Sequence, residues 1–261
     1  MSQATPSEIK TVADFLAQVA ALPLGTDRDN FFVFRGQSRD WSCVPGIARK
    51  PYTARGIYKR RDKMPKPAEF RLFVRFRDTT VPYQPAWVQV PSIAEYAWRQ
   101  LVLAQHYGLP TRLLDWNTKP LVALYFAVEE KKYHTEDGAI YVFPANLKRA
   151  FTVSALSRHN RNPPLYESSS DVGLLWPPNI DARVTAQGSI FTISRTPRVP
   201  VSKAPEFVVP SHSKNPILCE LQRLGITWGH LFPDLGGMAR SIKEESSTWD
   251  PSVGVVENGI G

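Results

Sequence analysis

The segment 92–128 constrains the fold most, because it carries two helix patterns separated by a short connection. Ser92 and Glu95 form an S-x-x-E capping box, apolar residues then recur at helical spacing, and Gly108 is typical of a helix end. The pattern predicts a helix over 93–107. A second apolar pattern at i, i+3, i+4 and i+7 follows it, so the fold has to bury two strongly apolar helices.

Strand and helix patterns also lie on both sides of this segment. Apolar runs predict strands over 31–35, 139–143, 189–194 and 206–210. Helical spacing predicts helices over 11–21, over 68–78 and through Ile217, Leu221 and Leu224. The stretches 38–67 and 144–182 are rich in Pro and polar residues, which indicates irregular structure.

Strands that alternate irregularly with helices and long loops are typical of an α+β domain. We expect a single domain over 1–261, with a mixed, mostly antiparallel sheet, packed helices and a core at about 31–240. The polar residues from about Lys243 predict a frayed C-terminal tail. The commonest glycine-rich nucleotide loops and the G-x-S-x-G motif of serine hydrolases do not occur.

The sequence gives no sign of a membrane span or of a metal centre. It has no run of about eighteen apolar residues, and its start lacks the basic and apolar pattern of a secretory signal, which predicts a cytoplasmic location and no membrane partner. The five histidines show no metal-ligand spacing with one another or with the two cysteines, so no metal is expected.

The net charge of +8 is concentrated between residues 49 and 78, which hold eleven Lys or Arg and three acidic residues. The densest run is Lys59, Arg60, Arg61 and Lys63. One interpretation is a solvated basic loop and helix face, and the other is a contact with nucleic acid or polyphosphate. Composition does not choose between them.

The apolar strand in NFFVFRGQSRDW, residues 30–41, runs directly into Arg35, Gly36 and Gln37. A guanidinium at the end of a buried strand needs a partner for its charge. Its forked donors suit a phosphate, and Gly36 lets other backbone or a ligand come close. The structural alternative for Arg35 is a buried ion pair or a clamp on backbone carbonyls.

A second polar cluster lies between the two helices of the segment 92–128. It combines a carboxylate, a guanidinium, a hydroxyl and aromatic rings, at Gln105, His106, Tyr107, Thr111, Arg112, Asp115, Trp116 and Asn117. Such a mixture between two buried helices predicts a pocket wall. Alternatively, Asp115 pairs with Arg112 and caps the next helix, while His106 is a hydrogen-bonded core residue.

Two polar residues later in the chain are further candidates. Gln187 precedes the strand 189–194, and its amide both donates and accepts hydrogen bonds, as a ribose or a base requires. Asp234 lies in LFPDLGG, where a turn or a helix cap is the favoured interpretation.

In this order, the clusters resemble the FRG domain family, which is named for its Phe/Tyr-Arg-Gly tripeptide. The matching pieces are FRGQSRDW, LVLAQHYGLPTRLLDWNTKPLVALYFA, RVTAQGSIFTIS and LGITWGHLFPDLGGMA, which span roughly 31–240. The central piece is long and specific. The resemblance implies a bacterial or phage protein, sometimes linked to toxin or antiviral defence modules.

A weaker resemblance, at the level of the fold, is to ADP-ribosyltransferases, in which an arginine on the first strand holds NAD. It implies an NAD-binding set of Arg35, Gly36, Gln37, Tyr107, Thr111, Arg112 and Trp116. In this set Thr111 and its loop position the nicotinamide end, and Tyr107 or Trp116 stacks on it.

The same resemblance implies where catalysis takes place. By order along the chain, Gln187 matches the glutamate of the transferases, but glutamine lacks the negative charge that stabilises an oxocarbenium-like transition state. Asp115, or else Asp234, supplies the missing carboxylate, and His106 serves as an acid, a base or a ribose donor.

We therefore expect an NAD-binding effector that cleaves the nicotinamide N-glycosidic bond, as an ADP-ribosyltransferase or an NAD glycohydrolase. A protein target or an inhibitor is a further expected partner. The alternative is a non-enzymatic nucleic-acid or nucleotide-binding module, in which the basic segment 49–78 contacts phosphates. An interaction scaffold, the third option, predicts no shared pocket for the polar clusters.

Overall fold

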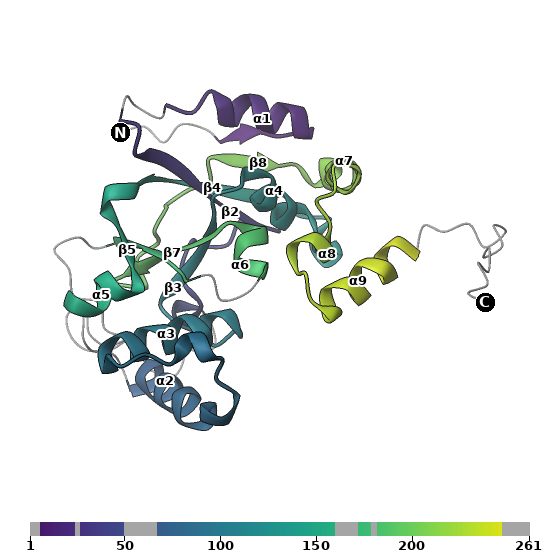
Figure 1. The fold of residues 1–261 in the computed structure, drawn as a ribbon. Coiled ribbons are helices and arrows are strands. Elements are labelled where there is room, and N and C mark those ends of the chain that lie inside the picture. The colour runs from purple at the N-terminus through teal and green to yellow at the C-terminus, as the bar shows by residue number, and fades with distance from the viewer. Residues whose placement is uncertain (1–5, 24–26, 50–66, 160–171, 179–181, 247–261) are drawn as a thin grey trace, which may run out of the picture.

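A computed structural model of the chain describes residues 6–23, 27–49, 67–159, 172–178 and 182–246 (Figure 1). The strands are β1 Ser7–Glu8, β2 Asn30–Gln37, β3 Leu113–Asn117, β4 Gly138–Asn146, β5 Ala150–Thr152, β6 Val172–Trp176, β7 Ser189–Ser194 and β8 Phe207–Val209. The helices are α1 Val12–Ala20, α2 Pro67–Thr79, α3 Ile93–His106, α4 Pro120–Val128, α5 Val153–His159, α6 Ala182–Gln187, α7 Lys214–Arg223, α8 Trp228–Leu231 and α9 Leu235–Ser246. A short 3-10 helix, η1, spans Gly46–Ala48.

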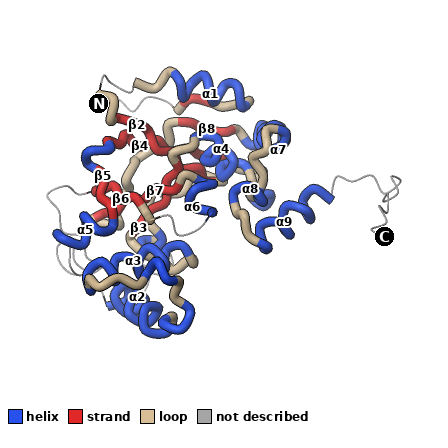
Figure 2. Tube along the Cα trace, viewed as in Figure 1, coloured by secondary structure: helices blue, strands red, loops and turns tan. Residues whose placement is uncertain are grey.

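These strands form one sheet in the order β1-β8-β4-β2-β3-β7-β6-β5 (Figure 2). Neighbouring strands run antiparallel, except that β1 is parallel to β8 and β5 is parallel to β6. The predicted α+β fold with a mixed, mostly antiparallel sheet is therefore confirmed. Across the described ranges, no helix has the length and apolar character needed to span a membrane.

The sheet is nearly interrupted at its centre, between β2 and β3. β2 pairs with β4 along its whole length, from Asn30 opposite Asn146 to Gln37 opposite Ala139. Its pairing with β3 is a single bridge between Phe34 and Asn117. Beyond this bridge the two strands no longer share ladder hydrogen bonds.

Helices cover one face of the sheet in two groups, one on each side of this interruption (Figure 1). α1, α4 and α7 pack on β2, β4 and β8 around Phe34 and Ile140. α2, α3 and α5 pack on β3, β6 and β7 around Trp98 and Leu113. Because successive strand residues point to opposite faces, Trp116 and its neighbours form a third core on the other face.

Gly36 lets α4 pack against β2 at backbone distance. A Cβ atom on Gly36 would lie 1.7 Å from the carbonyl oxygen of Ala123 in α4. The element that comes close to this glycine is thus a helix backbone. The glycine of the Phe-Arg-Gly tripeptide therefore allows close helix packing. This corrects the sequence-based alternative, in which Gly36 lets a ligand come close.

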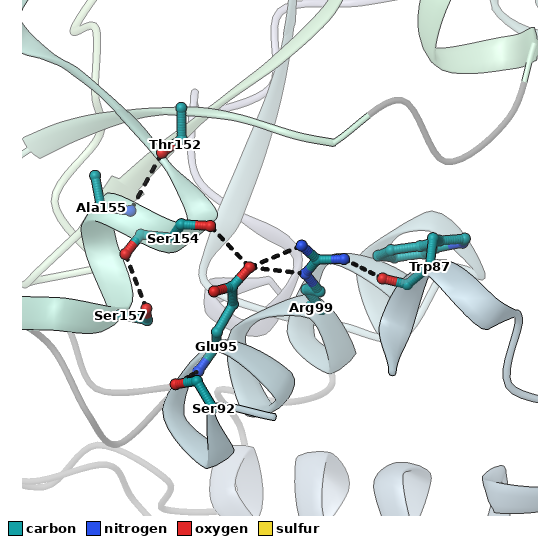
Figure 3. Close-up of polar contacts among 8 residues, drawn as sticks. All are labelled: Trp87, Ser92, Glu95, Arg99, Thr152, Ser154, Ala155 and Ser157. Atoms are coloured by element: carbon teal, nitrogen blue, oxygen red, sulfur yellow. Dashed lines mark hydrogen bonds and ion pairs between the residues drawn. The ribbon is translucent and has the colours of Figure 1, made fainter. Parts of the chain in front are cut away.

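A polar cluster fixes α3 against its neighbours (Figure 3). Ser92 caps the helix by accepting the backbone N–H of Glu95 at 3.3 Å. The Glu95 carboxylate accepts hydrogen bonds from Ser154 of α5 at 2.7 Å and from Arg99 at 2.7 Å, and Arg99 also donates to the backbone carbonyl of Trp87. The start of α3 is thereby tied to α5 and to the segment that precedes the helix.

Replacing Glu95 by Gln makes stability less dependent on pH. Partial burial raises the pKa of Glu95, but the hydrogen bonds from Ser154 and Arg99 and the charge of Arg99 outweigh it, so the net pKa lies below its usual value. A lowered pKa means that the folded state favours the carboxylate, so this contribution is present at neutral pH and is lost as the pH falls through the range where carboxylates titrate. Urea unfolding at several pH values should show that Glu95→Gln has a lower free energy of unfolding than the wild type, and that this difference shrinks as the pH falls. A difference that stays constant with pH contradicts the prediction.

The structure also corrects some sequence-based predictions. LLDWN, residues 113–117, was expected to be a connection and is the central strand β3. The stretch 144–182 was expected to be irregular and contains β5, α5 and β6 among its described residues. α8 and α9 were not predicted, and α9 continues to Ser246, past the expected start of a frayed tail.

Candidate functional site

A pocket of about 320 Å³ opens where β2 and β3 diverge. It is lined by Arg35, Gly46, Arg49, Gln105, Gly108, Leu109, Pro110, Leu113, Leu114 and Asp115. These residues come from β2, η1 and the position after it, the end of α3 with its following loop, and β3. The volume lies in the range of small-molecule sites, and polar and apolar groups share its walls.

Arg35 bridges the gap between the two central strands. Its Nη1 donates to the backbone carbonyl of Asp115 at 2.9 Å, and its Nε donates to Gln37 Oε1 at 3.2 Å. Gln37 in turn donates to the carbonyl of Trp41 at 2.7 Å. Within the described part of the chain no carboxylate pairs with Arg35, so the carbonyl clamp is present and the ion pair is not. The positive charge of Arg35 therefore remains available to an anion.

Arg49 places a second guanidinium at the same pocket. Its Nε and Nη2 both donate to the carbonyl of Val44, at 3.1 Å and 3.0 Å, and the side chain is exposed at the pocket. Desolvation by surrounding protein atoms and then the charge of Arg35 lower the pKa of Arg49, while the Asp115 carboxylate raises it. Arginine stays protonated at neutral pH, so two positive charges repel each other here.

The carboxylate of the pocket belongs to Asp115, which is exposed in the middle of β3. Gln105, in the last turn of α3, donates to Asp115 Oδ2 at 2.7 Å. Thr111 is buried behind Gln105 and donates to Gln105 Oε1 at 2.6 Å. Thus Arg35, Thr111 and Asp115, three residues singled out in the sequence, are brought together directly or through one neighbour.

Arg112 and Trp116 belong to the protein interior. Arg112 forms a two-pronged ion pair with Glu69 of α2, at 2.9 Å and 2.8 Å, with both side chains almost fully buried. Trp116 is fully buried and its indole N–H donates to Thr192 at 2.9 Å. The expected roles of Arg112 in substrate binding and of Trp116 in stacking are therefore corrected, because neither side chain faces the pocket.

The structure also places the other predicted residues away from the pocket. Gln187 ends α6, and its buried amide donates to the carbonyl of Leu231 at 3.0 Å, so it does not approach Arg35 as the resemblance implied. Tyr107 is 71 % exposed and meets the ring of His106 edge-on, and neither residue lines the pocket. Asp234 accepts the N–H of Gly237 at 2.8 Å, which confirms the helix cap.

The basic run Lys59, Arg60, Arg61 and Lys63 lies outside the described residues. The structure therefore neither supports nor weakens its predicted contact with nucleic acid. In the ranges that the structure covers, no three His, Cys, Asp or Glu side chains lie close enough together to hold a metal ion.

Two residues of the pocket were missed as ligand contacts in the sequence. Arg49 lies in a stretch rich in Pro, Gly and basic residues, where no periodicity shows which side chain points inward. Gln105 was noted in the polar cluster without a role. Its position in the last turn of a capped helix, three residues before Gly108, is the signal that places its side chain at the helix end, beside the following loop.

Comparison with known families matches residues 30–136 to the FRG domain. This range holds the Phe-Arg-Gly tripeptide, the central piece of the resemblance and every residue that lines the pocket. No curated protein and no solved structure matches the chain.

Proposed function

Because residues 30–136 match the FRG domain and include every residue that lines the pocket, we propose that this pocket binds NAD and cleaves its nicotinamide N-glycosidic bond. The chain then acts as an ADP-ribosyltransferase or as an NAD glycohydrolase. The observation that carries the proposal is that Arg35, Arg49 and Asp115 line one cleft, and that neither arginine has a carboxylate partner among the described residues.

The two arginines suit the pyrophosphate of a dinucleotide. A guanidinium offers forked N–H donors that match phosphate oxygens, and bringing an anion between two like charges relieves their repulsion. The partly exposed Leu109 and Pro110 offer an apolar contact to the flat nicotinamide ring. Substrate recognition thus combines charge at one part of the pocket with apolar contact at another.

Asp115 supplies the charge that bond cleavage requires. When the bond between ribose C1 and the nicotinamide nitrogen breaks, its electron pair goes to the nicotinamide, which leaves neutral, and positive charge develops on the ribose. A carboxylate beside that carbon stabilises the oxocarbenium-like transition state. Water then adds to C1 and releases one proton, giving ADP-ribose, or a hydroxyl or other acceptor takes the place of water.

Nicotinamide release from NAD by the purified protein tests this function. Arg35→Ala is expected to lower the initial rate by about a hundredfold or more, the usual effect of removing one preorganised donor from a charged site. Arg39→Ala is the matched control, because Arg39 pairs with Glu136 on the surface and does not line the pocket. It should retain the wild-type rate.

Two outcomes overturn the proposal. The first is the absence of nicotinamide release by the wild-type protein at saturating NAD, and the second is an unchanged rate in Arg35→Ala. If calorimetry detects NAD binding while no nicotinamide is released, a nucleotide-binding module is favoured in place of an enzyme.

The wider role follows from the same chemistry. By consuming NAD, or by attaching ADP-ribose to a cellular target, the protein would act as a toxin or as an antiviral effector in the bacterial cytoplasm. The resemblance to ADP-ribosyltransferases is consistent with this proposal through the arginine on an early central strand.

A further inference from the structure

A chain of hydrogen bonds runs from the protein interior to the pocket carboxylate. The backbone N–H of Leu113 donates to Thr111 Oγ1 at 3.0 Å, and the Thr111 hydroxyl donates to Gln105 Oε1 at 2.6 Å. Gln105 Nε2 then donates to Asp115 Oδ2 at 2.7 Å. Thr111 is only 1 % exposed, so the chain starts at a rigid, buried point.

The direction of this chain is fixed by its last bond. Because the Asp115 carboxylate only accepts hydrogen bonds, the group of Gln105 that faces it is the amide –NH2, and the amide oxygen faces Thr111. The Thr111 hydroxyl, whose oxygen accepts the N–H of Leu113, therefore directs its single hydrogen to Gln105 Oε1. Every donor therefore points toward the carboxylate, and the side-chain amide has one orientation that satisfies both of its partners.

The result is a carboxylate held at one oxygen by a neutral donor. A cation in the place of Gln105 would cancel the negative charge of Asp115, whereas an amide orients the carboxylate and leaves its charge in place. In the described part of the chain, Oδ1 of Asp115 has no hydrogen-bond partner, so it is the oxygen left to face a substrate.

We infer that Gln105 and Thr111 are positioning residues, which set the direction of the Asp115 carboxylate for the transition state; this rests on the proposed function. The charged groups at the same pocket are Arg35 from β2, Arg49 after η1 and Asp115 itself from β3, and His106 adjoins Gln105 on α3. Gln105 carries no charge, so its effect is one of orientation.

Kinetics of two substitutions at one position test this role. Gln105→Met keeps the length of the side chain and removes both hydrogen bonds; we expect kcat to fall by about tenfold to a hundredfold, with little change in KM. In Gln105→Glu two carboxylates meet, and a shared proton restores the donor only at lower pH. The ratio of its kcat to that of the wild type should therefore rise as the pH falls, whereas the ratio for Gln105→Met should stay flat.

A merely structural role gives different results. It would lower the melting temperature of both variants without separating their pH profiles. An unchanged kcat in Gln105→Met, or parallel pH profiles for Gln105→Glu and the wild type, overturns the inference.

The hydrogen bond itself is tested without turnover. In protein labelled with 15N-glutamine, the side-chain amide hydrogens of Gln105 should exchange slowly with water, and exchange should speed up in Asp115→Ala. Equal exchange in the two proteins overturns the inference even when the enzyme is active. If the wild type releases no nicotinamide, the proposed function fails, and the exchange experiment alone decides whether the carboxylate is held.

Discussion

Asp115→Asn lowers the rate of nicotinamide release by about a hundredfold to a thousandfold, the range found when one electrostatic contact to a transition state is removed. The substitution keeps the size of the side chain, and an asparagine oxygen still accepts the hydrogen bond from Gln105. What it removes is the negative charge. Because that charge is needed most when the ribose becomes positive, kcat falls while NAD affinity is largely retained.

Asp234→Asn is the matched control for this experiment. Asp234 caps α9, where asparagine caps equally well, and it does not line the pocket. Initial rates at saturating NAD measure the effect on kcat, and calorimetric binding constants measure the effect on NAD affinity. If Asp115→Asn keeps more than about a tenth of the wild-type rate, the carboxylate is not the group that stabilises the transition state.

Glu69→Ala lowers the free energy of unfolding by about 3–5 kcal/mol, the usual cost of leaving one member of a buried ion pair without its partner. The side chains of Arg112 and Glu69 are only 5 % and 2 % exposed, and Arg112 keeps its charge when Glu69 is removed. The contact of Arg112 with the carbonyl of Ser194, at 3.4 Å, is too long to replace this ion pair.

A double substitution separates the charge from the packing. In Glu69→Leu with Arg112→Met, both charges are gone and apolar side chains fill the space, so most of the lost stability should return. Glu8→Ala, which removes an exposed pair with Lys10, should change the free energy of unfolding by less than about 1 kcal/mol. Urea unfolding gives the free energy of unfolding of all three variants. A double variant as unstable as Glu69→Ala would contradict the claim that the charge left on Arg112 causes the loss of stability.

Long segments with a clear period could be predicted from the sequence. The capping box at Ser92 and the apolar spacing after it gave a helix over 93–107, and α3 spans Ile93–His106. The strand expected over 189–194 is β7. In both cases the segment itself carries the signal, which is a capping box with helical spacing for α3 and a run of β-branched and aromatic residues for β7.

Elements without alternation could not be predicted in this way. In β3, Leu113 and Leu114 are both buried because apolar cores lie on both faces of the strand, and the period of two disappears. α9 buries Gly237 and Ser241 while Leu235 is 91 % exposed, which reverses the pattern of an amphipathic helix. The buried face of such a helix is decided by its partners and not by its own residues.

The residues of the candidate site also differ in whether a local sequence signal or a distant partner decides their position. Arg35 was singled out because a charge after four apolar residues is locally unusual. Whether Arg112 faces a pocket or the interior depends on Glu69, which lies 43 residues earlier in the chain. Gln187 likewise finds its partner 44 residues later, at Leu231. Such distant pairings leave no trace in local spacing.

The single bridge between β2 and β3 leaves few backbone hydrogen bonds between the two halves of the sheet. Each half of the helical face has its own apolar core, whereas the third core, on the opposite face, contains residues of β2 and β4 as well as of β3, β6 and β7 and so joins the halves. Arg35 adds a side-chain hydrogen bond across the gap, to the backbone carbonyl of Asp115. A molecule bound in the pocket would contact both β2 and β3, so we expect binding to stiffen the sheet where its backbone pairing is weakest.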